Sequence, residues 1–276
     1  MPKVSVGDYE LAYSFNGVEP AGDGPVIVLV HGAGGQMADW PMAWRGNADM
    51  AGPDGPAPNS DDGGLAKFTT YAIDLPGHGR SGGTSQRTVD DYAQAVAAFM
   101  EALDLKNVFL VGHSMGAGIA LTLAVEGNPR LCAIAIVASS SKLLVSPAIL
   151  EGLQTDFEAT VDNIVKYSWH RDTGDAFRQE GRQRLLEAGP KVVHDDFFAC
   201  SGYDLSDKLE RVSIPVLVVA ATADKMVPAD KSQALAGKLR RAKYVALEGC
   251  GHYLQIEQTE AIGQALSDFL IKEIAL

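Results

Sequence analysis

The sequence predicts an α/β protein in which a largely parallel sheet is covered by helices on both faces. Continuous apolar runs of strand length, such as residues 25–30 and 214–220, alternate with longer segments of helical periodicity. Strands that are apolar throughout are typical of parallel sheets buried on both sides. The chain has 276 residues, of which 46% are apolar, and this suffices for one large domain or two small ones.

The first part of the chain is expected to form an edge hairpin followed by a buried strand. Residues 4–6 and 9–16 alternate well enough for two antiparallel strands. The buried strand at residues 25–30 runs into the glycine-rich loop His31-Gly32-Ala33-Gly34-Gly35. Glycines at the edge of a sheet allow a ligand to approach the backbone closely, although a tight turn has the same composition.

A long loop follows a short helix that is expected at residues 38–44. Residues 46–64 are rich in Gly, Pro, Asp, Asn and Ala and offer almost nothing to bury. We interpret them as an exposed excursion, because loops of this length are uncommon inside compact domains. The acidic residues of this loop do not follow the spacing of an EF-hand, so we expect no metal site; they are Asp49, Asp54, Asp61 and Asp62.

The middle of the chain alternates between strands and helices. Strand patterns occupy residues 68–73 and 131–138, and a third begins at Val108. A helix begins after Thr88, which is a suitable N-cap. Its apolar positions recur at helical spacing; they are Val89, Tyr92, Val96, Met100 and Leu103.

Residues 139–209 differ from their surroundings because they contain no strand-like run. Their pattern is helical, amphipathic and charged, which indicates an inserted helical unit. Later elements are expected at residues 214–220 (strand), 243–247 (strand) and 259–274 (helix). The sequence therefore predicts a core domain of residues 1–138 and 210–276 and a helical subdomain of residues 139–209.

The strand that begins at Val108 leads through Gly112-His113-Ser114-Met115-Gly116 into a helical pattern. Strand, sharp turn and helix are the context of a nucleophile elbow, in which a strained backbone exposes a serine hydroxyl. Side chains at Gly112 and Gly116 would collide with neighbouring elements, and the first N–H groups of the helix would face a developing oxyanion. The alternative is a turn whose serine caps the helix.

A nucleophilic serine needs a base and an acid that orients the base. Asp224 and His252 each follow a strand pattern, and the chain order Ser, Asp, His is the one expected for this arrangement. Asp230 is the rival acid, but it is expected to begin a helix. The other histidines lie in glycine-rich turns or in the helical insert; they are His31, His78, His113, His170 and His194.

Together these motifs resemble the α/β-hydrolase fold superfamily, in its serine hydrolase and esterase-like branch. The residues that carry the resemblance are His31-Gly32-Ala33-Gly34-Gly35, Asp74-Leu75-Pro76-Gly77-His78-Gly79-Arg80-Ser81, Gly112-His113-Ser114-Met115-Gly116, Asp224-Lys225-Met226-Val227-Pro228 and Gly251-His252. The resemblance implies the α/β-hydrolase fold, a mostly parallel eight-stranded sheet flanked by helices, with a helical cap inserted after strand 6. It also implies an oxyanion hole made by the backbone N–H groups of Ala33 and Met115. The long segment at residues 46–64 departs from the family, whose link at this point is usually shorter.

For function, the resemblance implies a serine hydrolase that cleaves a small carboxylic ester through an acyl-enzyme. Ser114 would be the nucleophile, His252 the base and Asp224 its orienting acid, with no cofactor or metal. Family haloalkane dehalogenases and epoxide hydrolases attack with aspartate, whereas position 114 is serine.

Several alternatives share this triad. A lactonase and a carbon–carbon bond hydrolase stay open, as do perhydrolase and acyltransferase activities, because the fold does not choose among them. A non-catalytic ligand-binding protein on the same fold is a further alternative, but such a protein has no need of all three triad residues.

The residues expected to bind substrate lie in the glycine loop, beside the nucleophile and in the cap. They are Gly32, Gly34, Trp40, His113, Trp169, Phe197, Phe198 and Tyr253. The aromatic residues of the insert indicate an apolar acyl or alcohol pocket, and attachment of the insert to the core explains them equally well. Residues 46–64 are expected to border the pocket entrance.

Composition limits the partners that this chain is expected to have. The net charge of −12 disfavours nucleic acid and anionic membrane surfaces. Three basic residues at helical spacing, Arg178, Arg182 and Arg184, are interpreted as an ordinary solvated face. No apolar run reaches membrane-spanning length, the N-terminal residues lack the core of a signal peptide, and three scattered cysteines do not suggest a disulfide framework. We therefore expect a cytoplasmic protein with a small-molecule, ester-like substrate; the sequence does not indicate its oligomeric state.

Overall fold

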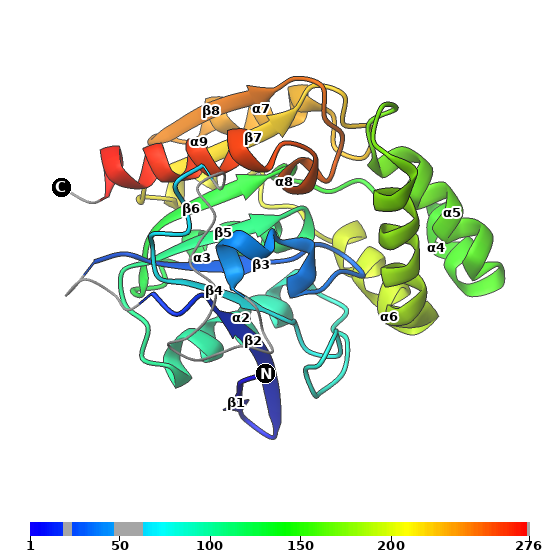
Figure 1. The fold of residues 1–276 in the computed structure, drawn as a ribbon, viewed down its shortest axis with the longest axis horizontal. Helices are drawn as coiled ribbons and strands as arrows, with labels where there is room; N and C mark the ends of the chain where they lie inside the picture. The colour runs from blue at the N-terminus through cyan, green and yellow to red at the C-terminus, as the bar shows by residue number, and fades with distance from the viewer. Residues whose placement is uncertain (19–23, 47–62, 275–276) are drawn as a thin grey trace.

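The structure, a computed structural model, describes residues 1–18, 24–46 and 63–274 (Figure 1). Within these residues eight strands form one sheet in the order β1-β2-β4-β3-β5-β6-β7-β8. Their bounds are β1 Lys3–Val6, β2 Tyr9–Phe15, β3 Val26–Val30, β4 Thr70–Ile73, β5 Val108–His113, β6 Leu131–Val137, β7 Val216–Ala221 and β8 Ala242–Leu247. β2 pairs antiparallel with β1 and β4, and every other pairing is parallel. The sheet confirms the expected edge hairpin and parallel core, with β3 and β5 side by side at its centre.

Helices cover both faces of this sheet. Their bounds are α1 Met42–Arg45, α2 Val89–Ala102, α3 Met115–Glu126, α7 Ala229–Lys238, α8 Leu254–Glu257 and α9 Thr259–Glu273. One hydrophobic core joins α2, α3 and α7 to the sheet, and the other joins α1, α8 and α9 to the opposite face. Along β5, Val108 and Leu110 belong to the first core, whereas Phe109 and Val111 belong to the second. A strand buried on both faces has no polar side to show, which explains its continuous apolar sequence.

The single helix expected at residues 38–44 is wrong. The chain forms a 3₁₀ turn at Met37–Asp39 and then the short helix α1, with Trp40 and Pro41 extended between them. Proline disfavours helical backbone in the residue before it, and Trp40 accordingly has φ −100° and ψ 143°. The expectations for residues 46–64, including the four aspartates, fall almost wholly on residues 47–62, which lie outside the described residues.

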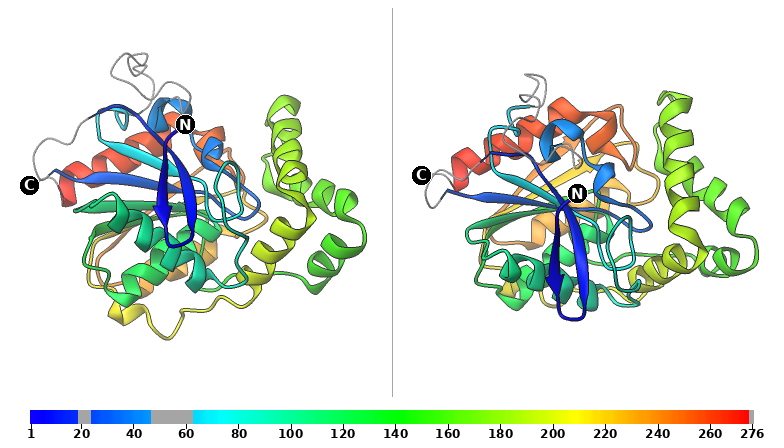
Figure 2. Two further views of the ribbon diagram at one scale, coloured as in Figure 1. Left: turned by 90° about the horizontal axis from the view of Figure 1, so that it is seen from below. Right: turned by 60° about the horizontal axis from the view of Figure 1, so that its bottom comes forward.

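The chain between β6 and β7 is helical, as expected. It contains α4 Pro147–Thr155, α5 Phe157–Ser168 and α6 Asp175–Ser201, which pack on one another around a core of their own. Figure 2 shows these three helices together beside one end of the sheet. The boundaries at residues 139 and 209 stay a prediction.

Helix α6 consists of two helical stretches joined at a kink. Gly189 has the non-helical angles φ 84° and ψ 163°, and Pro190 follows it. Proline in a helix removes a backbone hydrogen bond, and glycine tolerates a positive φ. No helix in the described part of the chain is long and apolar enough to cross a membrane.

Candidate active site

Ser114 stands at the junction of β5 and α3 with a strained backbone, φ 54° and ψ −115°. Its neighbours must be glycine because the turn is so tight. A Cβ atom on Gly112 would lie 2.1 Å from the carbonyl oxygen of Gly116, and one on Gly116 would lie 2.3 Å from that of Val30. Such strain costs about 1–3 kcal/mol and persists where the surrounding structure enforces it.

His252 and Asp224 reach Ser114 from the loops that follow β8 and β7. The Nε2 atom of His252 lies 3.0 Å from Ser114 Oγ, and its Nδ1 atom lies 2.8 Å from Asp224 Oδ2. Asp224 Oδ1 also accepts hydrogen bonds from the backbone N–H groups of Met226 and Val227. A carboxylate held in this way accepts the Nδ1 proton, so the lone pair of Nε2 faces the serine hydroxyl. The arrangement is able to take a proton from Ser114.

The rival acid, Asp230, lies in the first turn of α7, as expected. Its side chain is 68% exposed, and its ion-pair partner is Lys231. It therefore has neither the burial nor the position that Asp224 has.

The loop that carries His252, residues 248–253, is held against the chain between α5 and α6. The backbone N–H of His252 donates to the carbonyl of Ser168 at 2.7 Å. Glu257 accepts hydrogen bonds from the N–H groups of Gly251 and His170, at 2.5 and 2.7 Å, and from the hydroxyl of Thr173. Sequence reasoning missed Glu257, because a glutamate in a short helix has no motif that marks it.

His113 does not hydrogen-bond Ser114. Its Nε2–H donates to the carbonyl of His252 at 2.9 Å, and the two rings lie 4.8 Å apart. Burial, and secondarily the charge that His252 can carry, lower the pKa of His113 to about 3. His113 is therefore a neutral group that supports the backbone of His252.

The glycine loop after β3 lies beside Ser114. A Cβ atom on Gly32 would lie 3.2 Å from the Cβ of Ser114, and the N–H of Gly35 closes a turn onto the carbonyl of Gly32 at 3.1 Å. His31 Nε2 accepts a hydrogen bond from Leu75 N–H, so its Nδ1–H donates to the Gly32 carbonyl. Burial holds the pKa of His31 well below its usual range. The neutral side chain of His31 thus connects the glycine loop to the backbone of Leu75.

A pocket that is partly open to solvent lies above Ser114. Ala33 and four of the predicted substrate residues line it, namely Gly32, His113, Phe197 and Tyr253. The remaining wall is mostly aliphatic and was not predicted; it includes Leu143, Leu144, Val145, Ile164, Met226 and Val227. No Asp, Glu, Lys or Arg of the described residues lines this cavity. It suits an uncharged, apolar group.

The model of the alpha/beta hydrolase family matches residues 27–265 of this chain. The chain belongs to the alpha/beta hydrolase family. The family and the fold class that the sequence predicts are therefore confirmed.

Two relatives of this α/β hydrolase are named for different reactions, one for acetyl transfer and one for hydrolysis. The dihydrolipoyllysine-residue acetyltransferase component of an acetoin cleaving system from Pseudomonas putida is 24% identical over 277 residues. The alignment covers 90% of this chain but 64% of that protein, so the chain spans less than two thirds of its length. The 2-hydroxy-6-oxo-6-phenylhexa-2,4-dienoate hydrolase from Burkholderia cepacia is 23% identical over 270 residues, covering 91% of this chain and 89% of that one.

Among solved structures, the enol-lactonase from Burkholderia xenovorans LB400 superposes with a TM-score of 0.84. The two are 21% identical, and the match covers 98% of this chain and 100% of that one. At this identity the likeness shows a shared fold.

Four predicted substrate residues of the α/β hydrolase lie outside the cavity lining of the described structure. Gly34 donates its N–H to Asp196. Trp40 is buried against Trp44, and Trp169 stacks on Tyr253 with ring centroids 4.6 Å apart. Phe198 is 40% exposed and carries Arg87 over its ring. The sequence predicted that these aromatic side chains are packed against other residues. It could not predict which of them face the cavity, because tertiary packing decides their orientation.

The expectation of a solvated arginine face is wrong for two of the three residues. Arg178 is partly buried and donates to the backbone carbonyls of His170 and Arg171. Arg182 pairs with Asp162 on α5, but Arg184 is only 19% exposed and pairs at 2.5 Å with the buried Asp39. The reason is that α6 packs over the turn after β3. In the described residues, no group of three His, Cys, Asp or Glu side chains is placed to hold a metal ion.

Proposed function

We propose that this α/β hydrolase cleaves small carboxylic esters with an uncharged acyl group, through an acyl-enzyme on Ser114. The observation that carries the proposal is the hydrogen-bonded series Asp224–His252–Ser114 at the floor of an apolar cavity. A serine, a base and an orienting acid in this order form the working unit of serine hydrolases. The cytoplasmic location stays a prediction.

In the proposed reaction, Ser114 Oγ attacks the ester carbonyl carbon while its proton passes to His252 Nε2. The carbonyl oxygen becomes an oxyanion, and collapse of the tetrahedral intermediate expels the alcohol, which takes the proton from His252. Water then attacks the acyl-enzyme with His252 again as base, releasing the acid and restoring Ser114. Asp224 stays ionised throughout and holds the imidazole tautomer.

The oxyanion hole is proposed to consist of the N–H groups of Met115 and Ala33. Met115 is the first residue of α3, and N–H groups in the first turn of a helix have no partner within it. Ala33 lines the same cavity as Ser114. Loss of one such donor typically raises the activation barrier by roughly 2.7–4 kcal/mol.

We assign the role of a cap to α4, α5 and α6, within residues 139–209. Val145, Ile164 and Phe197, from this segment, form part of the cavity wall. A wall made by inserted helices sets substrate shape, whereas the reacting groups come from the sheet.

A carbon–carbon bond hydrolase is the less favoured candidate. The B. cepacia relative is named for a dienoate, a substrate with a carboxylate, and a buried carboxylate needs a cationic or hydrogen-bonding partner. The described cavity wall offers no Lys or Arg. A lactone is a cyclic ester and needs no different chemistry, so lactonase activity is an outcome that the assay must separate.

The test is hydrolysis of p-nitrophenyl acetate, butyrate and octanoate by the wild type and by Ser114→Ala. We expect turnover that S114A abolishes, with a preference among chain lengths that reports the cavity. A serine-directed phosphonate should label the wild type at Ser114. Lactones and a hydroxy-oxo-dienoate are assayed alongside. Turnover of the dienoate without ester turnover would contradict the ester proposal, and a folded protein with neither turnover nor labelling would contradict catalysis altogether.

A further inference from the structure

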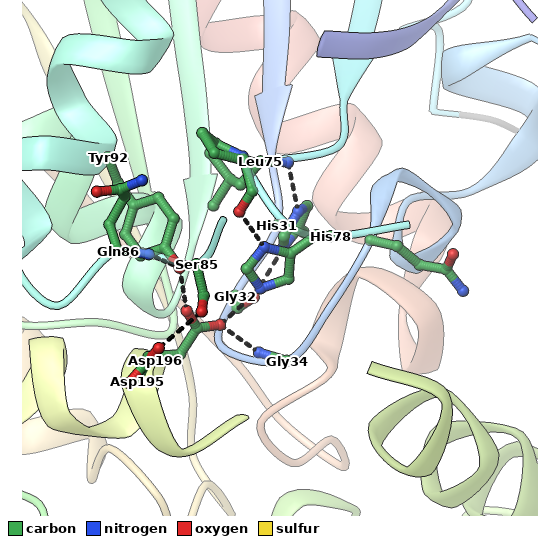
Figure 3. Close-up of polar contacts among 12 residues, drawn as sticks. His31, Gly32, Gly34, Leu75, His78, Ser85, Gln86, Tyr92, Asp195 and Asp196 are labelled. Atoms are coloured by element: carbon green, nitrogen blue, oxygen red, sulfur yellow. Dashed lines mark hydrogen bonds and ion pairs between the residues drawn. The ribbon is translucent and has the colours of Figure 1, made fainter. Parts of the chain in front are cut away.

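A buried carboxylate on α6, that of Asp196, contacts Gly34 of the glycine loop after β3 (Figure 3). Asp196 has no exposed side-chain surface. Its Oδ2 atom accepts hydrogen bonds from the N–H of Gly34 at 2.7 Å and from His78 Nε2 at 2.8 Å, and its Oδ1 atom accepts one from the hydroxyl of Tyr92. Asp196 does not line the cavity above Ser114. It therefore touches the loop without touching the substrate site.

The charge of Asp196 follows from its partners. His78 Nδ1 lies 3.0 Å from the carbonyl of Pro76, and its Nε2 atom faces Asp196. Both ring nitrogens meet acceptors, so both carry hydrogen and the ring is an imidazolium. Burial lowers the pKa of His78, but the charge and hydrogen bond of Asp196 outweigh burial and raise it. The Tyr92 hydroxyl accepts from Gln86 N–H and donates its own proton to Asp196. Asp196 is thus an ionised acceptor for three donors.

The hydrogen bond to Gly34 fixes the shape of the loop. Gly34 is the third residue of the turn that Gly35 closes onto Gly32, and its φ is +64°, as a type II turn requires. Holding the Gly34 N–H fixes the peptide plane between Ala33 and Gly34, and hence one of the two backbone angles of Ala33. Helix α6 also packs directly on the turn, since a Cβ atom on Gly34 would lie 2.6 Å from Leu185.

We propose that Asp196 is a positioning residue for the oxyanion loop, residues 31–36, and that it holds the Ala33 N–H ready for the developing oxyanion. The inference rests on the proposed function, since it assumes an oxyanion beside Ala33. It adds a dependence that the triad does not have, because the loop after β3 keeps its shape through a charge on a helix about 160 residues later, between β6 and β7.

The decisive variant is Asp196→Asn. An asparagine oxygen can still accept from Tyr92, and its NH₂ group can donate to a neutral His78. The Gly34 N–H then faces another donor and loses its acceptor, while the volume of the side chain is unchanged. We expect kcat for p-nitrophenyl butyrate to fall about 10- to 100-fold, because displacement of a catalytic group by a fraction of an ångström has effects of this order. KM should stay within about twofold, since the cavity wall is untouched.

The matched control is Asp195→Asn. Asp195 is the neighbouring residue on α6, and it contacts Ser85 at 2.7 Å and Lys191 at 2.5 Å instead. D195N removes a charge from the same helical turn and leaves the Gly34 contact in place. Its kcat should stay close to that of the wild type.

A second readout separates positioning from general weakening of the fold. A trifluoromethyl ketone forms a tetrahedral adduct on serine whose oxygen occupies the oxyanion site. Its inhibition constant should rise in D196N by the same factor as kcat/KM falls, whereas that of the unfluorinated ketone should not change. Equal losses in D195N and D196N, or wild-type kcat and analogue affinity in D196N, would overturn the proposal.

Amide hydrogen exchange reads the same anchor without a substrate. Exchange at Gly34 should be slow in the wild type and in D195N and fast in D196N, and slow exchange in D196N would overturn the proposal. Failure of the proposed function looks different, because the wild type would then show no turnover that depends on Ser114. If D196N does not fold, Tyr92→Phe serves instead, since it removes one of the three donors that hold Asp196. Faster exchange at Gly34 in Y92F should then be accompanied by weaker binding of the trifluoromethyl ketone, and a change in one without the other would overturn the proposal.

Discussion

The two loops that flank Ser114 are held in place in different ways. The oxyanion loop depends on charged side chains of α6. Asp196 is bonded to Gly34, and Arg184 is bonded to Asp39, which in turn accepts the backbone N–H of Gln36 at 3.0 Å. The histidine loop, residues 248–253, depends on a backbone bond from His252 to Ser168 and on Glu257, which lies a few residues further along the same segment.

This difference means that the two halves of the proposed site should respond differently to mutation and to changes of charge. The histidine loop keeps one anchor whichever side chain is lost, because the main-chain hydrogen bond from His252 to Ser168 survives substitution. The anchors described for the oxyanion loop, Asp196 and Asp39, are side-chain groups alone, and they respond to mutation and to the charge of their partners. Changes in α6 should therefore reach the oxyanion loop first.

The largest effect is expected when the histidine loop keeps its anchors but loses its reacting group. His252→Ala should lower kcat for p-nitrophenyl butyrate by at least about 10⁴-fold, as removal of a triad base typically does. The thermal midpoint should change little, since the backbone bond to Ser168 stays. His170→Ala is the control, because His170 contacts Glu257 through its backbone; activity in H252A near that of H170A would refute the role of His252.

A smaller effect is expected from the second anchor of the oxyanion loop. Arg184→Gln should lower the free energy of unfolding by about 1.5–3 kcal/mol, the usual contribution of a hydrogen bond to a charged group, because Asp39 is buried. Urea denaturation measures the change. Arg182→Gln is the matched control, since its partners Glu158 and Asp162 are exposed and such pairs contribute about 0–1 kcal/mol. Equal losses in the two variants would mean that α6 is not tied to the loop through Asp39.

Glu257→Gln tests the histidine loop with the same change of charge that D196N makes in the oxyanion loop. The side-chain oxygen of glutamine still accepts a hydrogen bond, whereas its NH₂ group faces another donor and one hydrogen bond is lost. The backbone bond from His252 to Ser168 remains. We expect kcat to fall only about 3- to 10-fold, less than in D196N. Steady-state kinetics give kcat for both variants. A larger loss of kcat in E257Q than in D196N would contradict the conclusion that the oxyanion loop is the more sensitive of the two.

The smallest expected effect is a dependence on pH that only the oxyanion loop should have. The pKa of His78 is raised in the folded protein. Its contribution to stability is therefore fully present below the unfolded histidine pKa of about 6.5 and is lost as pH rises through the folded value. The difference in unfolding free energy between the wild type and His78→Gln should shrink as pH rises above the unfolded value of about 6.5 and through the raised folded pKa. A difference that stays constant with pH would show that His78 is not charged.

Much of the fold could be predicted because its signals are local. Continuous apolar runs marked the buried strands, and Gly112 and Gly116 marked the turn around Ser114, since a tight turn leaves room for no side chain. The strand-end positions of Asp224 and His252 followed from the same alternation of elements. The single helix at residues 38–44 failed because Pro41 changes the conformation of its neighbour Trp40.

The rest could not be predicted because it depends on how separate elements meet. Asp196 sits on a charged helix, and nothing in its sequence neighbourhood distinguishes it from the adjacent Asp195, which pairs with the exposed Lys191. Its partner His78 lies 118 positions away. The cavity wall at Leu143 and Leu144 comes from a connection before α4 that has no periodicity to interpret.

The backbone of Ser114 bears on any attempt to make this protein more robust. The backbone of Ser114 has φ 54° and ψ −115°, a conformation that glycine adopts with less strain than a residue with a Cβ atom. An inactive S114G protein should therefore resist heat and denaturant better than S114A, which keeps the Cβ atom. Selection for stability alone would therefore favour loss of the whole Ser114 side chain, and with it the hydroxyl. Engineering for robustness should leave residues 112–116 untouched and work on surfaces far from the elbow, where stability and turnover are not in competition.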